Sequence, residues 1–218
     1  MRFLNTAAAF LMAFSFTSAA VQASDKVGVF ALYSAEKGVS QSAFDNTGCS
    51  LTRQGAIVAR QGNLDLPDAN RFVLLNCNGP QLSGGGAKGL LANLEAPLIL
   101  EGGLEFFEEP VKSDEVKNRQ YLLKVAYYNN KDINARDADL KAIGNIVEPL
   151  EDRYHNELFI DVHRASGVRT PDEVVAIYYD TPENGSRFRE NNQEILEMVG
   201  AFNMKHLVSF TYLVAKPD

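Results

Sequence analysis

Residues 120–129 (QYLLKVAYYN) form an aromatic and apolar run that is interrupted by one lysine and closed by asparagine. Branched and aromatic residues favour extended structure, so this run predicts a largely buried strand. Three more strands are predicted at residues 157–164 (ELFIDVHR), 173–180 (EVVAIYYD) and 205–215 (KHLVSFTYLVA). In the first and last of these, apolar residues recur at every second position, which is the period of a strand.

Two amphipathic segments separate these strands and predict helices. Residues 134–147 carry an apolar stripe and end before Pro149, and residues 187–202 carry a second stripe. The order strand, helix, strand, strand, helix, strand is typical of a ferredoxin-like βαββαβ unit. In such a unit both helices cover one face of a four-stranded antiparallel sheet. The predicted fold class is therefore α+β, with one sheet face left open.

The open sheet face is the first candidate site. Its expected side chains mix aromatic and polar groups, with Tyr179 in place of Tyr178 in the alternative register: Tyr128, Asp161, His163, Tyr178, Ser209 and Thr211. Apolar surface of this extent on a soluble protein usually meets a partner, and tyrosine tolerates both burial and water. We expect this face to contact an unknown protein, a small ligand or a second copy of the chain.

The first half of the chain is less regular. Strands are predicted at residues 26–35, 71–77 and 97–108, the last one bent at Gly102 and Gly103, while residues 40–63 are too polar and glycine-rich for a long helix. This order predicts a smaller mixed α/β half that loosely resembles the second half. A tandem of two related domains and one domain with a shared sheet both fit.

Domain boundaries follow from these patterns and from the polar composition of residues 111–120, which suits a linker. The expected arrangement is an N-terminal domain at 24–110 and the ferredoxin-like domain at 121–218. Residues 1–23 combine an early arginine, an apolar core and small residues before Ser24, which is typical of a cleaved signal peptide. We therefore expect an extracytoplasmic protein, periplasmic or secreted, without a membrane anchor after cleavage.

Charge and cysteine content narrow the partners and the compartment. The formal net charge is −7, and the basic residues do not cluster, so nucleic acid is not an expected partner. The two cysteines, Cys49 and Cys77, form an even count. In an oxidising compartment this count predicts a disulfide bond between them.

A glycine-rich segment at residues 76–91 lies between a predicted strand and a short predicted helix. Turns in this context bind phosphate through free backbone N–H groups, which makes a weak anion-binding site of five residues: Ser83, Gly84, Gly85, Gly86 and Lys88. The segment does not match a nucleotide-binding P-loop, because Lys88 follows alanine and precedes glycine.

A second weak candidate combines Asp161 and His163, which project from the same face of one strand, with His155 nearby and His206 farther away. Such a cluster could hold a metal or act as acid and base only if another strand supplied a third group. No catalytic residue, metal or cofactor is assigned from the sequence.

The leading hypothesis is a soluble extracytoplasmic binding or interaction protein that uses the open sheet face or a groove between the halves. Two alternatives stay open: an enzyme with a site around Asp161 and His163, and a homodimer-forming α+β barrel-like protein.

Overall fold

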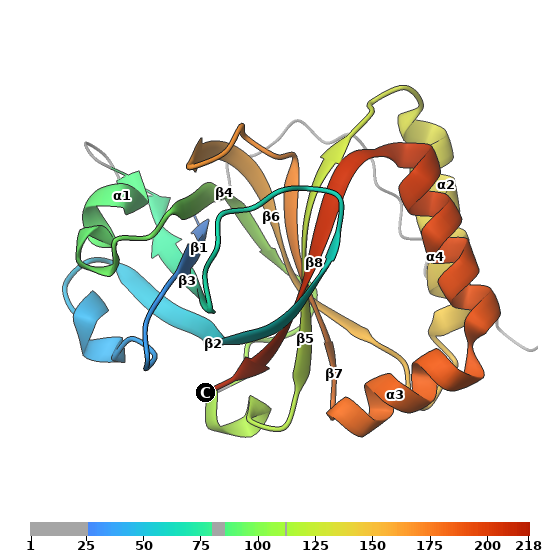
Figure 1. Cartoon of the computed structure of the whole chain (residues 1–218), viewed down its shortest axis with the longest axis horizontal. Coiled ribbons are helices and arrows are strands. Elements are labelled where there is room, and N and C mark those ends of the chain that lie inside the picture. The colour runs from blue at the N-terminus through green and yellow to red at the C-terminus, as the bar shows by residue number, and fades with distance from the viewer. Residues whose placement is uncertain (1–25, 80–85, 112) are drawn as a thin grey trace, which may run out of the picture.

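The computed structural model describes residues 26–79, 86–111 and 113–218, and in them eight antiparallel strands form a closed barrel (Figure 1). Around the barrel the strands follow the order β1-β3-β2-β8-β5-β7-β6-β4, and β4 pairs again with β1. The strands are β1 (Lys26–Tyr33), β2 (Cys49–Gly62), β3 (Arg71–Asn78), β4 (Leu98–Phe106), β5 (Gln120–Tyr128), β6 (His155–Ser166), β7 (Glu173–Tyr179) and β8 (Leu207–Pro217).

The predicted ferredoxin-like unit with an open sheet face, preceded by a smaller mixed half, is wrong. The four C-terminal strands continue on both sides into N-terminal strands, because β8 pairs with β2 and β6 pairs with β4. Both halves therefore contribute four strands to one barrel. The strands carry apolar residues on both faces for this reason: one face lines the barrel interior, and parts of the other pack under helices and turns.

The helices lie outside the barrel. In Figure 1, α2 (Ile133–Val147), α3 (Pro182–Asn191) and α4 (Gln193–His206) stand together on one side, and the short α1 (Gly86–Leu90) lies on the opposite side. The described residues also include the 3₁₀ turns η1 (Gln41–Phe44), η3 (Ala92–Leu94) and η4 (Ser113–Val116). The single helix predicted at residues 187–202 is two helices that meet at Asn192.

Side-chain caps explain where two of these helices begin. The carboxylate of Asp132 accepts the backbone N–H of Ala135 at 2.9 Å at the start of α2. Thr181 accepts the N–H of Asn184 at 3.1 Å at the start of α3, and Pro182 occupies the first turn. Both arrangements satisfy backbone donors that would otherwise lack a partner.

Three groups of buried apolar residues hold the fold together. The largest fills the barrel interior and includes Phe30, Phe72 and Leu123. A second lies on the outer face of the N-terminal strands, where Phe44 and Leu91 contribute to it. A third packs α2, α3 and α4 against the outer face of the C-terminal strands. The layered arrangement follows from the period of two along each strand.

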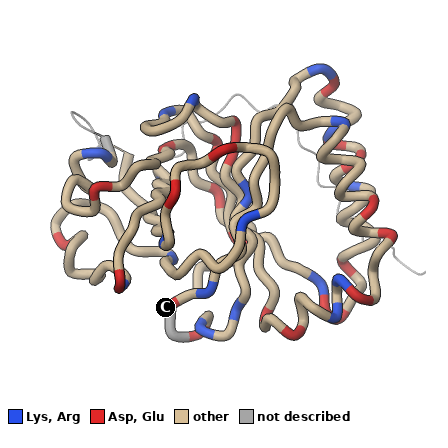
Figure 2. The backbone as a smooth tube through the Cα atoms, in the orientation of Figure 1, with Lys and Arg blue, Asp and Glu red and all other residues tan. Residues whose placement is uncertain are grey.

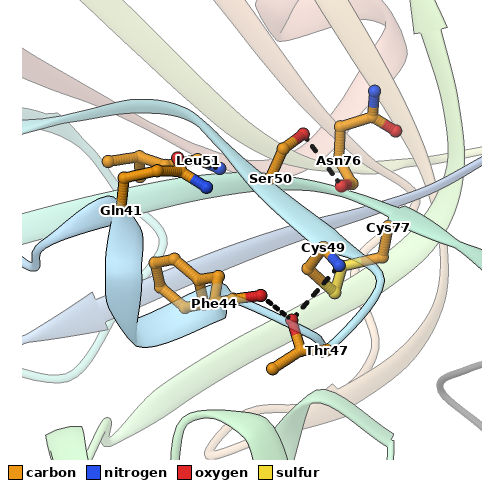
Figure 3. Close-up of a disulfide and its surroundings, with 8 residues drawn as sticks. All are labelled: Gln41, Phe44, Thr47, Cys49, Ser50, Leu51, Asn76 and Cys77. Atoms are coloured by element: carbon orange, nitrogen blue, oxygen red, sulfur yellow. Dashed lines mark hydrogen bonds between the residues drawn. A yellow bond between two sulfur atoms is a disulfide. The ribbon is translucent and has the colours of Figure 1, made fainter.

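The predicted disulfide is confirmed. Cys49 and Cys77 are directly opposite each other on β2 and β3, and their sulfur atoms are bonded (Figure 3). Nearby, Thr47 donates to the carbonyl of Phe44 and accepts the N–H of Cys49, which fixes the turn before β2. Among the residues described, no helix has the length and apolar character needed to span a bilayer.

In β4, where a bend was predicted at Gly102 and Gly103, the pairing with β6 shifts register between Glu101 and Gly102. Gly102 lies so close to β6 that an added Cβ would meet the carbonyl oxygen of Asp161 at 1.7 Å. An added Cβ on Gly103 would have no neighbour closer than 4.0 Å. Close packing of β4 against β6 therefore requires a glycine at position 102 but not at position 103.

Candidate functional site

A buried ion pair lies between the C-terminal strands and the helices. Lys124 Nζ of β5 is 2.7 Å from Glu173 Oε1 of β7, and their side chains are only 8% and 5% exposed. Glu173 pairs with Ala126 in the sheet register, so Lys124 and Glu173 project from the same sheet face. That face packs against α2, α3 and α4, since Ala126 belongs to the cluster beneath them.

Other ion pairs on the outer faces of the barrel have a partner that reaches water. Arg71 pairs with Asp218, which is 36% exposed, and buried Glu101 pairs with Arg164, which is 66% exposed. Burying both members of a pair removes two charges from water, and their attraction often does not repay that cost. The Lys124–Glu173 pair is therefore poorly explained by fold stability alone.

Tyr128 extends this pair toward the surface. Its hydroxyl donates to Glu173 Oε2 at 2.7 Å, and the guanidinium of Arg136 lies 4.5 Å from the centre of its ring. The pKa of the Tyr128 hydroxyl is raised, chiefly by burial and further by the negative charge of Glu173. Tyr128 is therefore a neutral hydrogen-bond donor throughout the physiological pH range.

Aromatic rings and one unsatisfied amide surround the pair. Lys124 Nζ lies 5.6 Å from the ring centre of Phe202, and Tyr212 pairs with Lys124 in the register of β5 and β8. Asn203 Nδ2 is 3.5 Å from the hydroxyl of Tyr212. Within the described residues, the buried Asn203 Oδ1 accepts no hydrogen bond. A buried acceptor without a donor is costly, so a partner from outside the chain would stabilise it.

A carboxylate and an imidazole connect α2 to α4. Asp139 Oδ2 lies 2.8 Å from Nε2 of His206, the last residue of α4, and 2.7 Å from Lys205 Nζ. The His206 ring packs on Phe202, with ring centres 4.9 Å apart, and is almost fully buried. Hydrogen bonds from His206 and then Lys205 lower the pKa of the Asp139 carboxyl. Asp139 therefore holds the imidazole in one orientation.

A small hollow lies at the start of α2, and we call it the α2 hollow. The space between atoms there, about 150 Å³, includes open solvent and leaves no enclosed room for a water molecule. Its lining comes from the end of β5, the loop to α2, the first turns of α2 and the end of α4: Tyr128, Asn129, Asn130, Lys131, Asp132, Ile133, Arg136 and His206. Tyr128 thus joins the α2 hollow to the buried Lys124–Glu173 pair. We take the pair, Tyr128, Asn203 and the α2 hollow together as the helix-layer site.

A second polar cluster closes one end of the barrel interior, and we call it the barrel-end cluster. Arg53 and Arg119 both donate to Glu157 Oε1, at 2.5 Å and 3.1 Å, and Arg53 Nε also donates to Tyr121. The guanidinium of Arg119 lies over the ring of Tyr178. The Arg53 and Glu157 side chains are 3% and 4% exposed, so this ion pair is buried as fully as Lys124–Glu173. It differs in having two further hydrogen-bonding neighbours, Arg119 and Tyr121, which suits a structural role.

The residues predicted for the open sheet face are dispersed. Tyr128 belongs to the helix-layer site, whereas Tyr178 belongs to the barrel-end cluster and donates to Glu108 Oε2 at 2.8 Å. Thr211 is buried and donates to the carbonyl of Leu64 at 2.6 Å, and Ser209 is partly exposed on β8. Figure 2 shows both signs of charge interspersed along α2, α3 and α4, which cover part of the face expected to be open.

Asp161 and His163 are brought together, with Oδ2 and Nε2 3.0 Å apart, but both side chains are more than half exposed. His155 lies elsewhere, stacked on Tyr178, and His206 belongs to the α2 hollow. In residues 26–79, 86–111 and 113–218, no three His, Cys, Asp or Glu side chains are placed to hold a metal ion.

The glycine-rich candidate falls mostly outside the described residues, which exclude Ser83, Gly84 and Gly85. Gly86 begins α1, and Lys88 is exposed on it. The predicted signal peptide at residues 1–23 also lies outside the described residues.

Comparison with solved structures supports the barrel. A structure described as an anthrone oxidase-like protein superposes with a TM-score of 0.51 at 10% sequence identity, covering 89% of this chain and 93% of that one. A candidate monooxygenase from Lactobacillus acidophilus NCFM gives 0.49 at 11% identity, covering 88% and 93%. Another, from Fusobacterium nucleatum subsp. nucleatum ATCC 25586, gives 0.48 at 9% identity, covering 88% and 91%.

At such low identity the first similarity shows a shared fold, an eight-stranded antiparallel barrel, and it agrees with the correction of the predicted ferredoxin-like class. No protein-family model matches the sequence, and no curated protein sequence matches it either. The function must therefore be argued from the site.

Glu173, Asn203 and Asp139 were not among the predicted site residues. One signal was available for Glu173, because Lys124 and Glu173 are single opposite charges within or beside two strongly apolar runs. A pair of this kind suggests that the two strands lie side by side with both charges on one face. Asn203 and Asp139 look like ordinary polar positions on amphipathic helices.

Proposed function

We propose that this chain is an exported binding protein that holds a small molecule at the helix-layer site. The observation that carries the proposal is the Lys124–Glu173 pair, in which both charges are buried between the helices and the sheet. The disulfide supports export, because such bonds persist in oxidising compartments.

The energetics favour a ligand-related role for this pair. Replacing a buried ion pair by apolar residues of similar size is often neutral or stabilising, whereas removing one partner costs about 3–5 kcal/mol. Contact with a ligand would explain why the chain has an ion pair that adds little net stability. The free acceptor on Asn203 and the hydroxyl of Tyr128 offer further polar contacts beside aromatic walls, as is common in small-molecule sites.

The experiment separates stability from binding with a double substitution. The chain without residues 1–23 is screened by thermal melting against a panel of small organic acids, sugars and aromatic compounds. A ligand that binds the folded state raises the melting temperature. Lys124→Met/Glu173→Leu is expected to fold with unchanged or higher stability and to lose that shift.

The matched control is Arg187→Gln/Asp152→Asn, which removes an exposed ion pair that joins α3 to the loop before β6. This variant should keep the ligand-induced shift. The proposal fails if no compound of the panel binds, or if the apolar double variant binds as well as the unchanged protein.

An enzyme is the second candidate, because Lys124 forms an ion pair with Glu173 and the hydroxyl of Tyr128, whose pKa is raised by burial, donates to the same carboxylate. Perturbed ionisable groups are frequent in active sites. Prolonged incubation of a bound compound followed by mass spectrometry distinguishes the two. Recovery of the unchanged compound supports binding alone, and conversion that depends on Lys124 supports an enzyme.

A further inference from the structure

Helix α2 carries more apolar side chains than the barrel buries. Ile143 and Val147 are buried in the cluster between the helices and the sheet. The side chains of Ile133 and Leu140, in contrast, are 54% and 43% exposed. Positions seven apart lie on the same side of a helix, so Ile133 and Leu140 form an exposed apolar surface that we call the α2 stripe. The fold therefore uses only part of the apolar surface of this helix.

Gly144 adjoins the α2 stripe one turn beyond Leu140. A glycine in the interior of a helix lowers helix stability relative to alanine. A Cβ added to Gly144 would have no neighbour within 4 Å, so packing among the described residues does not require a small residue there. A surface from outside the chain could approach the backbone of α2 closely at this point.

The charges on α2 balance, although the whole chain is acidic. The helix contains two basic and two acidic residues, Arg136, Lys141, Asp137 and Asp139, whereas the chain has a formal net charge of −7. Two copies of an acidic chain repel each other, and this repulsion is smallest where the local charge is zero. A strongly basic or strongly acidic partner would find no matching excess of charge on α2. The charge pattern therefore favours a second copy of the chain.

The order of the charges fits two antiparallel α2 helices. Asp137 and Lys141 are one turn apart, so they lie on the same flank of the α2 stripe. Lys141 is exposed, and Asp137, which pairs with Arg136 through one oxygen, is partly exposed. A two-fold axis through the middle of α2 places Asp137 of each copy opposite Lys141 of the other, beside the two Leu140 side chains. Parallel helices would place each charge opposite its own kind.

We propose that two copies of this chain associate through antiparallel α2 helices, about a two-fold axis near Leu140. The inference does not depend on the proposed binding function. One pair of helices buries less surface than a standard protein–protein interface, so this dimer forms reversibly and dissociates on dilution.

Sedimentation velocity over a range of protein concentrations tests the association, with the complete chain and with the chain without residues 1–23. Both should change from monomer to dimer as the concentration rises. Leu140→Glu should weaken the dimer by at least about tenfold, because it removes apolar contact and brings two like charges together at the axis. Ile146→Glu is the matched control. Ile146 is equally exposed, at 45%, but it lies on another side of the same helix, so the dimer should persist.

Charge reversal tests the antiparallel arrangement. Asp137→Lys places lysine opposite Lys141, and Lys141→Asp places aspartate opposite Asp137, so each variant alone should dimerise less than the unchanged protein. An equal mixture of the two variants should recover the dimer, because every facing pair then joins opposite charges. Circular dichroism and thermal melting confirm that each variant is folded.

Four results would overturn the inference. They are a monomer at every concentration, equal effects of Leu140→Glu and Ile146→Glu, a mixture of the charge-reversal variants that stays monomeric, and association that requires residues 1–23. The last result would make that segment the contact in place of α2. None of them bears on ligand binding at the helix-layer site, so the proposed function is tested separately.

Discussion

The guanidinium of Arg119 lies 3.6 Å from the centre of the Tyr178 ring and also donates to Glu157 at 3.1 Å. Arg119 directly precedes β5, and Tyr178 is the second-last residue of β7. The contact therefore joins the segment between the two halves to the barrel end. The hydroxyl of the same tyrosine donates a hydrogen bond to Glu108. Both ends of the segment between β4 and β5 are thus attached to Tyr178.

Arg119→Ala should destabilise the protein by about 2–3 kcal/mol, since it removes a desolvated cation–π contact and one of two donors to buried Glu157. Urea unfolding followed by circular dichroism measures the change. Arg187→Ala is the control, because that arginine pairs with Asp152 at the surface, and it should cost clearly less. Equal losses for both variants would contradict the structural role of the barrel-end cluster.

Two neighbouring glycines should respond differently to alanine. Gly102→Ala forces a Cβ against the backbone of β6 and should either prevent folding or cost more than about 3 kcal/mol. Gly103→Ala meets open space and should change stability by less than about 1 kcal/mol. Thermal melting of the two variants decides the point. A tolerated Gly102→Ala would show that β4 and β6 are not packed this closely.

The double variant Cys49→Ala/Cys77→Ala should lose about 3–4 kcal/mol of unfolding free energy, because the bond closes a loop with a sequence separation of 28 residues. Denaturant unfolding of the variant and of the oxidised protein measures the difference. Thiol titration of the unfolded, unreduced protein should detect no free thiol. Two free thiols would show that the bond does not form.

Buried tyrosines should limit stability at high pH. Burial is the main reason that the pKa of Tyr121, of Tyr154 and of Tyr179 is raised to about 12. An unfolded tyrosine ionises near about 10, so the stabilisation is complete below that pH and is lost as the pH rises toward about 12. Phenolate absorbance and circular dichroism should change together in this window.

Tyr154→Phe tests this assignment, since no hydrogen bond of the Tyr154 hydroxyl is found within the described residues and its ring packs edge-on against Phe188. The variant should lose stability less steeply above about pH 10 and keep its stability at neutral pH. An unchanged alkaline slope would mean that Tyr154 is not buried in solution.

The local elements of the C-terminal half were predictable, but their assembly was not. The run at residues 120–129 corresponds to β5, and its apolar side chains on both faces were visible in the sequence. The two helical segments, residues 134–147 and 187–202, each carry one apolar stripe. This suggested that the helices cover one face of the sheet and leave the other face uncovered. The sheet instead closes into a barrel, because β2 and β4 of the other half pair with β8 and β6, and pairing between such distant segments leaves no local pattern.

The longest strand, β2, was not recognised because residues such as Arg53, Gln54 and Arg60 make it look polar. Arg53 is in fact buried in the barrel-end cluster, and Arg60 bonds to carbonyl groups of the next loop. The helix-layer site was only partly predictable for a similar reason. Tyr128 and His206 were considered, but Glu173 and Asp139 gain their significance from neighbours that only the fold supplies.

Barrel closure also restricts how this protein can meet other chains. In the order β1-β3-β2-β8-β5-β7-β6-β4, closed by β4 and β1, each strand has a hydrogen-bonded neighbour on both sides. A free strand edge is what templates strand addition by another polypeptide and much β-type aggregation. A partner of this chain is therefore expected to recognise exposed side chains, because no strand of the described barrel lies at the edge of a sheet.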